Sequence, residues 1–266
     1  MPRFNLEPNP ETGMAALDGR HALVTGGGRG IGRAIAAALT RAGANVTVLG
    51  RDETRLAETT NAGDAAGYLI ADVTDPQAVH AGVAEAAKAR GAIDILVANA
   101  GGAESAPFAK ADPGQFRRMF DLNTMGVVHA TQAVLAGMTS RGFGRIVAIA
   151  STASLKGYAY VSAYCAAKHA VVGLVRALAL ETAHSGVTVN AICPGYADTE
   201  LTQASIDRIV DKTGLSREDA LAAMLKGNPL GRLVNPQEVA AAVLYLCSAD
   251  AAAVTGTTLA VAGGEV

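Results

Sequence analysis

The chain has 266 residues, of which 50% are hydrophobic, 17% are charged and 30 are glycine. This composition excludes a disordered chain, and glycine without a triplet period excludes collagen. With 22 basic and 24 acidic residues the net charge is -2, which gives no basic footprint for nucleic acid or an anionic membrane, so a small-molecule partner is favoured.

Cysteine and histidine usage argues against disulfides and structural zinc. The three cysteines, Cys165, Cys193 and Cys247, include no CxxC pair, and an odd number favours a reducing compartment. The five histidines show no HExxH or other short ligand spacing. We therefore expect a cytoplasmic protein without a metal site.

The N-terminal segment has no apolar run long enough for a secretory signal, and its prolines discourage a helix. Residues 1–17 are therefore predicted to form a flexible arm, in which Met14 is an alternative start. Residues 122–140 carry no charge, but polar residues interrupt them, so they match poorly the roughly 20 apolar residues of a membrane span. No membrane association is expected.

From residue 20 onward, short β-branched apolar runs alternate with alanine-rich segments long enough for helices. The predicted strands, in chain order, are His21–Thr25, Val46–Leu49, Tyr68–Ala71, Ile93–Ala98, Arg145–Ala150, Val187–Ile192 and Thr257–Val261. The predicted helices are Gly30–Ala42, Thr54–Ala62, Pro76–Ala89, Pro113–Arg141, Ala163–Ala183 and Pro236–Cys247. Strands that are apolar on both faces fit a parallel sheet covered by helices on both sides. We predict one doubly wound, Rossmann-type α/β domain with seven parallel strands over residues 18–266, with a helical substrate lid at about 196–227.

The first predicted strand leads into the glycine loop Thr25-Gly26-Gly27-Gly28-Arg29-Gly30-Ile31-Gly32, and a helix follows. Without a Cβ, glycine permits unusual φ values and lets a pyrophosphate approach the amides at the positive end of the helix. A tight structural turn is the alternative for a glycine cluster alone, but the position between strand and helix favours a dinucleotide site. The predicted cofactor contacts are Gly26, Gly28, Arg29, Gly30, Ile31 and Gly32.

The end of the second strand indicates which dinucleotide binds. Gly50 stands where a carboxylate would bond the ribose 2′-hydroxyl of NAD, and Arg51 follows it. A guanidinium at this place attracts a 2′-phosphate, and Arg29 would supply a second positive charge. NADP(H) is therefore favoured, with NAD(H) as the other candidate. The alternative is two solvated arginines, with Asp52 neutralising Arg51.

Two short motifs follow the next strands. Asp72-Val73 comes after the third strand and Asn99-Ala100-Gly101 after the fourth. Ligands of open α/β sheets bind at the carboxyl ends of the strands, which is where both motifs are predicted to lie. Turn formation by asparagine and glycine is the alternative.

A tyrosine and a lysine four residues apart supply a candidate acid–base pair. Tyr164 and Lys168 would emerge from one face of a helix. Free tyrosine has a pKa of about 10, and a neighbouring ammonium together with a cationic nicotinamide ring would lower it toward a usable range. Ser151, ending the fifth strand, is placed to donate a hydrogen bond to a substrate oxygen. A Tyr/Lys pair alone is more often ordinary surface chemistry.

Taken together and in this order, the motifs resemble those of the short-chain dehydrogenase/reductase family over residues 18–264. They are Thr25-Gly26-x3-Gly30-x-Gly32, Asn99-Ala100-Gly101, Asn123, Ser151, Tyr164-x3-Lys168, and Pro194-Gly195 with Thr199. The resemblance implies a catalytic tetrad of Asn123, Ser151, Tyr164 and Lys168. In it Tyr164 passes a proton to or from the substrate oxygen, Lys168 holds the nicotinamide ribose, and Asn123 orders a water that links Lys168 to solvent.

The resemblance also implies further cofactor contacts. Asp72 and Val73 would contact the adenine, Asn99, Ala100 and Gly101 the adjoining ribose, and Pro194, Gly195 and Thr199 the nicotinamide amide. Tyr164 and Lys168 are predicted cofactor contacts as well. Two positions depart from the family pattern: Ala98 replaces an Asn, and Ala262 replaces an Asp of the C-terminal motif. The second change puts the C-terminal turn and subunit packing in doubt, not the chemistry.

Substrate choice is expected to rest on residues around the predicted pocket. The stretch from Ala166-Ala167-Lys168-His169 through Ala191-Ile192-Cys193-Pro194-Gly195 is similar to 3-hydroxybutyrate dehydrogenases and to 3-oxoacyl thioester reductases of the same family. This resemblance favours a 3-oxo/3-hydroxy acid or thioester. The lid cations Lys212, Arg217 and Lys226 either meet a phosphate of such a thioester or form a solvated helix face. The predicted substrate contacts are Ser151, Thr152, Ala153, Tyr158, Tyr164 and Tyr196, and Tyr160 is a further candidate.

Two other functions stay open at this point. One is an NAD-dependent dehydrogenase of another secondary alcohol, whether cyclic, aromatic or a sugar. The other is a sensor that binds dinucleotide without catalysis, which would have no need of Tyr164 and Lys168.

Two predicted helical segments are apolar around most of their circumference, namely Pro113–Arg141 and Ala163–Ala183. The family resemblance implies a homotetramer packed through them.

Overall fold

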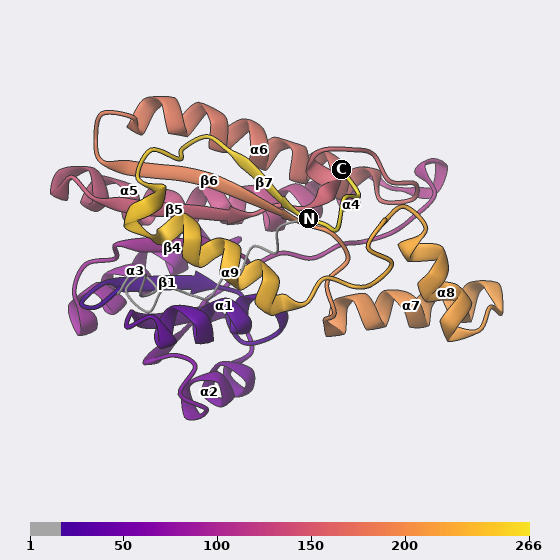
Figure 1. The fold of residues 1–266 in the computed structure, drawn as a ribbon, viewed down its shortest axis with the longest axis horizontal. Coiled ribbons are helices and arrows are strands. Elements are labelled where there is room, and N and C mark those ends of the chain that lie inside the picture. The colour runs from indigo at the N-terminus through magenta and orange to yellow at the C-terminus, as the bar shows by residue number, and fades with distance from the viewer. Residues whose placement is uncertain (1–16) are drawn as a thin grey trace, which may run out of the picture.

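The computed structural model describes residues 17–266 and contains one seven-stranded sheet. All of its strands are parallel, in the order β3-β2-β1-β4-β5-β6-β7 (Figure 1). The predicted seven-stranded parallel sheet is confirmed. The strands are β1 His21–Thr25, β2 Asn45–Gly50, β3 Gly67–Ile70, β4 Ile95–Ala98, β5 Gly144–Ile149, β6 Val187–Pro194 and β7 Thr258–Val261.

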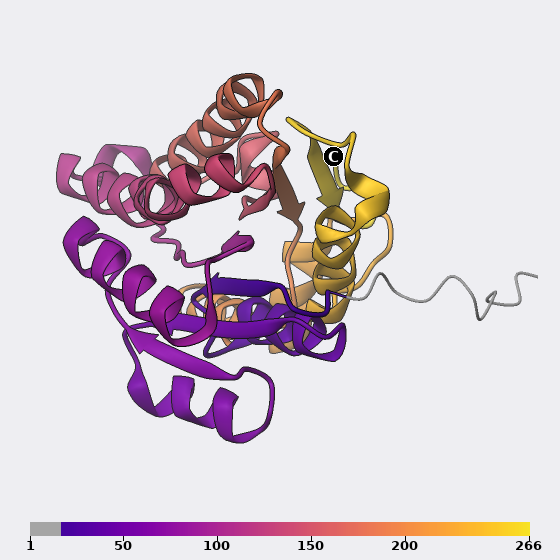
Figure 2. The same ribbon diagram turned by 90° about the vertical axis from the view of Figure 1, so that its left-hand side faces the viewer.

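Helices cover both faces of the sheet because consecutive strand residues point to opposite sides. Val24 packs with helices α1 (Gly30–Arg41) and α9 (Pro236–Cys247), and its neighbour Leu23 packs in a separate core on the other face. That second core is built with α3 (Pro76–Arg90), α5 (Gly126–Arg141) and α6 (Ser162–Thr182), and the two helical layers are apparent in Figure 2. Helix α2 (Glu53–Asn61) joins the first core through Leu56.

Most element boundaries fall within two residues of the predicted ones, but one predicted helix is interrupted. The segment predicted as a single helix over 113–141 consists of α4 (Pro113–Phe120), a π-helical turn at Asp121–Met125, and α5. Such turns insert one residue into a helix and occur often at functional sites. Here the turn carries Asn123.

The predicted arm lies almost entirely outside the described residues, as does Met14. Leu17, which was assigned to the arm, is buried, and its amide donates to the carbonyl of Ala42 at 2.7 Å. The folded body therefore includes Leu17.

Two helices project from the carboxyl-terminal edge of the sheet. Helices α7 (Glu200–Thr213) and α8 (Arg217–Leu225) follow β6 and extend away from the sheet, toward the right in Figure 1. Helical structure in the predicted lid segment is thus confirmed. Arg217 pairs with Asp207, so this cation joins α8 to α7 instead of standing alone.

Helix α6 is long and apolar enough, by length and composition, to cross a membrane. It also packs against β6 and holds Val171 and Val175 in the larger core. Its apolar surface is therefore used, at least in part, inside this domain.

Helix α9 starts with a capping box that makes a stability prediction possible. The Asn235 side chain accepts from the amide of Gln237 at 3.1 Å, and Glu238 accepts from the amide of Asn235 at 2.8 Å. We expect Asn235→Ala to lower the free energy of unfolding by about 1 kcal/mol, because a helix amide loses its partner. Chemical denaturation measures this, and an unchanged midpoint would contradict it.

Candidate active site

The loops after β1 and β4 are joined at the carboxyl edge of the sheet. The Thr25 hydroxyl accepts from the amides of Asn99 and Ala100, both at 3.0 Å. The Asn99 side-chain amide donates to the carbonyls of Thr25 at 3.0 Å and Gly26 at 3.2 Å. Two motifs more than seventy residues apart are thus locked together, as the carboxyl-edge argument predicts.

The glycine loop is tightly turned and lies close to helix α1. Gly26 and Gly30 have φ values of 66° and 52°, which other residues rarely adopt. A Cβ on Gly32 would lie 2.2 Å from the carbonyl oxygen of Gly26. The loop therefore stays close to α1, whose first amides form an anion-binding end. This cradle fits the predicted cofactor.

The segment after β6 meets the same loop. Thr199, the residue before α7, lies against Gly30, where an added Cβ would be 3.2 Å from its Cγ2. Gly195 donates its amide to Val261 at 3.1 Å, beside Ala262. Gly30, a predicted pyrophosphate contact, and Thr199, a predicted nicotinamide contact, are therefore neighbours. The C-terminal turn forms with Ala262 in place, since its carbonyl accepts from Glu265 at 3.2 Å.

Asp72 and Val73, which follow β3 and are predicted to contact the adenine, have different surroundings. Asp72 forms an ion pair with Arg51 at 3.3 Å, and the Arg51 side chain is 72% exposed. Burial alone would raise the pKa of Asp72, but hydrogen bonds from Thr74 and Arg51 outweigh it and lower the pKa. Val73 has a buried side chain packed toward Gly126, so that side chain belongs to the core. Contact of Val73 with adenine stays a prediction.

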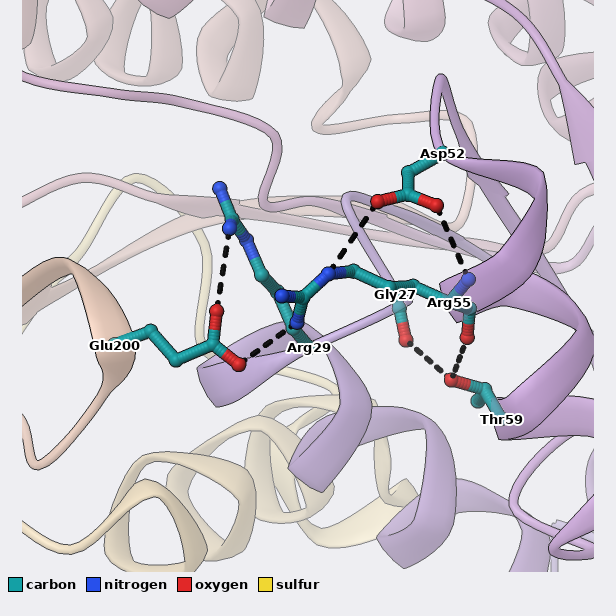
Figure 3. A network of polar contacts seen from close by, with 6 residues as sticks. All are labelled: Gly27, Arg29, Asp52, Arg55, Thr59 and Glu200. Carbon is teal, nitrogen blue, oxygen red and sulfur yellow. Dashed lines mark hydrogen bonds and ion pairs between the residues drawn. The ribbon is translucent and has the colours of Figure 1, made fainter.

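A network of charges surrounds the glycine loop, and sequence reasoning missed most of it. Glu200, the first residue of α7, pairs with Arg29 at 3.3 Å and with Arg55 of α2 at 2.7 Å (Figure 3). Arg55 also pairs with Asp52 at 3.3 Å. The sequence indicated Arg29 as a cofactor contact and Asp52 as a partner of Arg51, but Asp52 pairs with Arg55 and Arg51 with Asp72, and no motif marks Arg55 or Glu200.

Ser151, Tyr164 and Lys168 come together between β5 and α6. Ser151 follows β5, and its hydroxyl accepts from the amide of Ala153 at 3.1 Å. The Lys168 ammonium is buried and donates to the carbonyl of Ile149 at 2.8 Å, with its nitrogen 5.9 Å from the centre of the Tyr164 ring. The predicted trio therefore shares one site.

Burial shifts the pKa of both titratable members of this trio. It raises the pKa of Tyr164 to about 12, although a hydrogen bond with Ser151 opposes the rise. It also lowers the pKa of Lys168 to about 8. The expected lowering of the Tyr164 pKa is therefore not found in the chain by itself, in which the partly buried ring packs against Met119 of α4 and Ala163 of α6.

Asn123 lies next to the trio, but its side chain serves the loop after β4. Its amide nitrogen donates to the carbonyls of Gly102 at 2.9 Å and Met119 at 3.0 Å, and its oxygen accepts from the amide of Gly102 at 3.2 Å. A Cβ on Gly101 would lie 2.8 Å from that oxygen and 3.5 Å from the Lys168 nitrogen. Gly101 thus lies close to both side chains, and the proton relay stays a prediction.

A cavity of about 450 Å³ lies between the segment 156–159 and helices α7 and α8, and Ser151, Tyr164 and Lys168 are not among its lining residues. Tyr158 and Tyr196 line it, in edge-to-face contact at 6.2 Å between ring centres. Tyr160, in contrast, is not among the lining residues and is 66% exposed, so the structure does not place it in this wall. Thr152 and Ala153 are buried, and the hydroxyls of Thr152 and Tyr158 form a hydrogen bond at 2.6 Å.

One carboxylate in this cavity was not anticipated. Glu265 has a side chain that is only 3% exposed, and it accepts from Tyr158 at 2.5 Å and pairs with Lys156 at 3.2 Å. A phenol has one proton, so Tyr158 gives it to Glu265 and accepts from Thr152. A lone Glu after a glycine pair carries no signal in sequence.

An open parallel α/β sheet with a glycine loop, and a Ser-Tyr-Lys trio beside it at the same edge, defines the class of nucleotide-dependent oxidoreductases. The model of the short chain dehydrogenase family matches residues 20–209. The chain belongs to this family and is an oxidoreductase.

Known relatives extend over nearly the whole chain. An acetoacetyl-CoA reductase of Rhizobium meliloti is 41% identical, over 92% of this chain and 98% of its own. A D-beta-hydroxybutyrate dehydrogenase of the same organism is 38% identical, over 91% and 97%. The crystal structure of an actinorhodin polyketide ketoreductase with NADPH has a TM-score of 0.87 and 39% identity, over 92% and 97%.

Proposed function

We propose that this protein is an NADPH-dependent reductase that interconverts a 3-oxoacyl thioester or acid and the corresponding 3-hydroxy compound. The meeting of Ser151, Tyr164 and Lys168 next to the glycine cradle carries the proposal. The names of the two relatives above, which act on acetoacetyl-CoA and D-beta-hydroxybutyrate, support the substrate class.

Three side chains divide the chemistry. The nicotinamide supplies or takes up the hydride when it is bound. Ser151 donates a hydrogen bond to the substrate carbonyl as negative charge develops on it. Tyr164 gives that oxygen its proton in the reductive direction, and Lys168, held by Ile149, orients the ribose. Asn123 fixes the loop that borders Lys168.

The preference for NADPH rests on Arg51 at the end of β2. Its side chain is exposed, and Gly50 before it leaves no carboxylate to bond a ribose 2′-hydroxyl. The similar actinorhodin ketoreductase, whose crystal structure contains NADPH, also supports this cofactor. Hydrogen bonds between charged groups of this kind contribute about 1.5–3 kcal/mol.

Removing the Arg51 guanidinium tests the cofactor directly. We expect Arg51→Gln to raise the KM for NADPH about tenfold or more, since a charge-assisted contact is lost, while the KM for NADH changes little. Steady-state kinetics with both cofactors measure this. Arg41→Gln, an exposed arginine at the end of α1, is the matched control. Wild-type rates that are equal or better with NADH would contradict the assignment.

The segment 196–227 is proposed as the lid over the substrate. Ile209 of α7 and Met224 of α8 line the same cavity as Tyr158, so these helices form one wall of it.

The proposed substrate class is tested by comparing kcat/KM for acetoacetyl-CoA, acetoacetate and a cyclic ketone. A clear preference for the cyclic ketone would overturn the 3-oxoacyl proposal.

We infer a cytoplasmic homotetramer that binds neither nucleic acid nor membranes. Leu180 of α6 is 79% exposed and Phe120 beside the π turn is 42% exposed, an arrangement that subunit packing through these helices would bury. The three cysteines are buried and unpaired, which suits a reducing compartment. Light scattering at micromolar concentration tests the assembly, and a monomer would contradict it.

A further inference from the structure

We propose that Arg55 is a further cation of the 2′-phosphate site and that Glu200 competes with the phosphate for it. This inference rests on the proposed use of NADPH. It assigns a cofactor-selecting role to a residue of α2 and an opposing role to the first residue of α7. Variants of Arg55 and of Glu200 should therefore change the affinity for NADPH in opposite directions.

Arg55 is held directly over the glycine loop. A Cβ added to Gly28 would lie 3.2 Å from the Cβ of Arg55, so the backbones of the loop and α2 are in close approach. The Thr59 hydroxyl, one turn further along α2, donates its single proton to the carbonyl of Arg55 at 2.9 Å, and the carbonyl oxygen of Gly27 lies 3.5 Å from the same hydroxyl (Figure 3). The position of Arg55 beside the loop is thus fixed by backbone contacts and not by its charge.

The Glu200 carboxylate gathers two guanidinium groups at this place. Figure 3 shows one of its oxygens directed to Arg29 and the other to Arg55. Arg29 belongs to the glycine loop and was predicted to contact a 2′-phosphate. A carboxylate bridges it to Arg55 here, so an anion bound at this place is within reach of both guanidinium groups.

The pairs with Glu200 are exchangeable. The side chains of Glu200, Arg29 and Arg55 are 57%, 61% and 36% exposed, and exposed ion pairs contribute little stability. A phosphate monoester carries a charge of about -1.5 to -2 and three acceptor oxygens, against one charge and two oxygens for a carboxylate. The phosphate therefore wins the competition, but its affinity is reduced by the cost of displacing Glu200.

Dinucleotide binding to two single variants separates the roles. By isothermal titration calorimetry, we expect Arg55→Gln to weaken NADPH binding about fivefold or more, since a charge-assisted contact is lost. Glu200→Gln should instead tighten it by roughly threefold, because the competing charge is removed. NADH, which lacks the phosphate, should bind all variants alike. Glu218→Gln, an exposed acid in the first turn of α8, is the matched control.

The double variant completes the test. With Arg55→Gln present, Glu200→Gln should gain less than it does in the wild-type background, because one shared partner is gone. Unchanged or weaker NADPH binding by Glu200→Gln would overturn the competition, and unchanged binding by Arg55→Gln would overturn the assignment of Arg55. If Arg51→Gln also left NADPH binding unchanged, the NADPH preference itself would fail.

Discussion

Replacing Tyr164 by phenylalanine is expected to lower kcat for carbonyl reduction by about 10²- to 10⁴-fold, the usual contribution of a positioned general acid. The variant keeps the ring, which packs with Met119 and Ala163, and removes only the hydroxyl beside Ser151. Dinucleotide affinity should stay within about threefold, because the glycine cradle is separate from the phenol. Stopped-flow or steady-state assays of cofactor oxidation measure the rate.

The control for this variant removes the same atom elsewhere. Tyr245 lies on α9, is 48% exposed, and Tyr245→Phe should leave kcat unchanged. If Tyr164→Phe retained more than about a tenth of the wild-type kcat, the phenol would not be the acid, and water or Ser151 would have to supply the proton.

Replacing Gly32 by alanine is expected to weaken NADPH and NADH binding alike, by about tenfold or more, because small-to-large changes at a packed site cost about 1–3 kcal/mol. The added methyl would lie 2.2 Å from the Gly26 oxygen and 2.5 Å from the Asn99 side-chain nitrogen. The hydrogen bond between those two groups must then break or move. Denaturant unfolding should show a loss of similar size.

A glycine in another helix provides the matched control. Gly82 lies in α3, and a Cβ there would meet Leu69 at 3.4 Å, an ordinary contact. Gly82→Ala should therefore leave dinucleotide binding unchanged and stabilise the protein by up to about 1 kcal/mol. Normal binding of both cofactors by Gly32→Ala would contradict the role given to the tight loop.

The sheet and the convergence of its loops were predictable because they follow from local patterns. Parallel strands end at one edge, so Thr25, Asn99 and Ser151 had to lie near one another once the strands were identified. The π turn at Asp121–Met125 was not predicted, since one inserted residue hardly disturbs the apolar spacing of a long helix.

Contacts between distant residues account for the rest of what sequence could not supply. Glu200 is 171 positions from Arg29, and nothing in either local segment indicates the pair. The buried carboxylate of Glu265 depends on how the final turn packs against Tyr158 and Lys156. The raised pKa of Tyr164 likewise reflects its burial in the folded chain, whereas the expected lowering depended on the Lys168 ammonium together with a bound cationic nicotinamide ring.

The most direct test of the proposed function follows the absorbance of reduced nicotinamide when the purified protein is mixed with NADPH and acetoacetyl-CoA, with Tyr164→Phe as the blank. We expect the wild-type protein to consume NADPH and to form an equal amount of the 3-hydroxy thioester, with a much slower rate in the blank. Tight NADPH binding without turnover of this thioester, 3-oxo acids, cyclic ketones, quinones or sugars would contradict it and indicate a protein that only binds the dinucleotide.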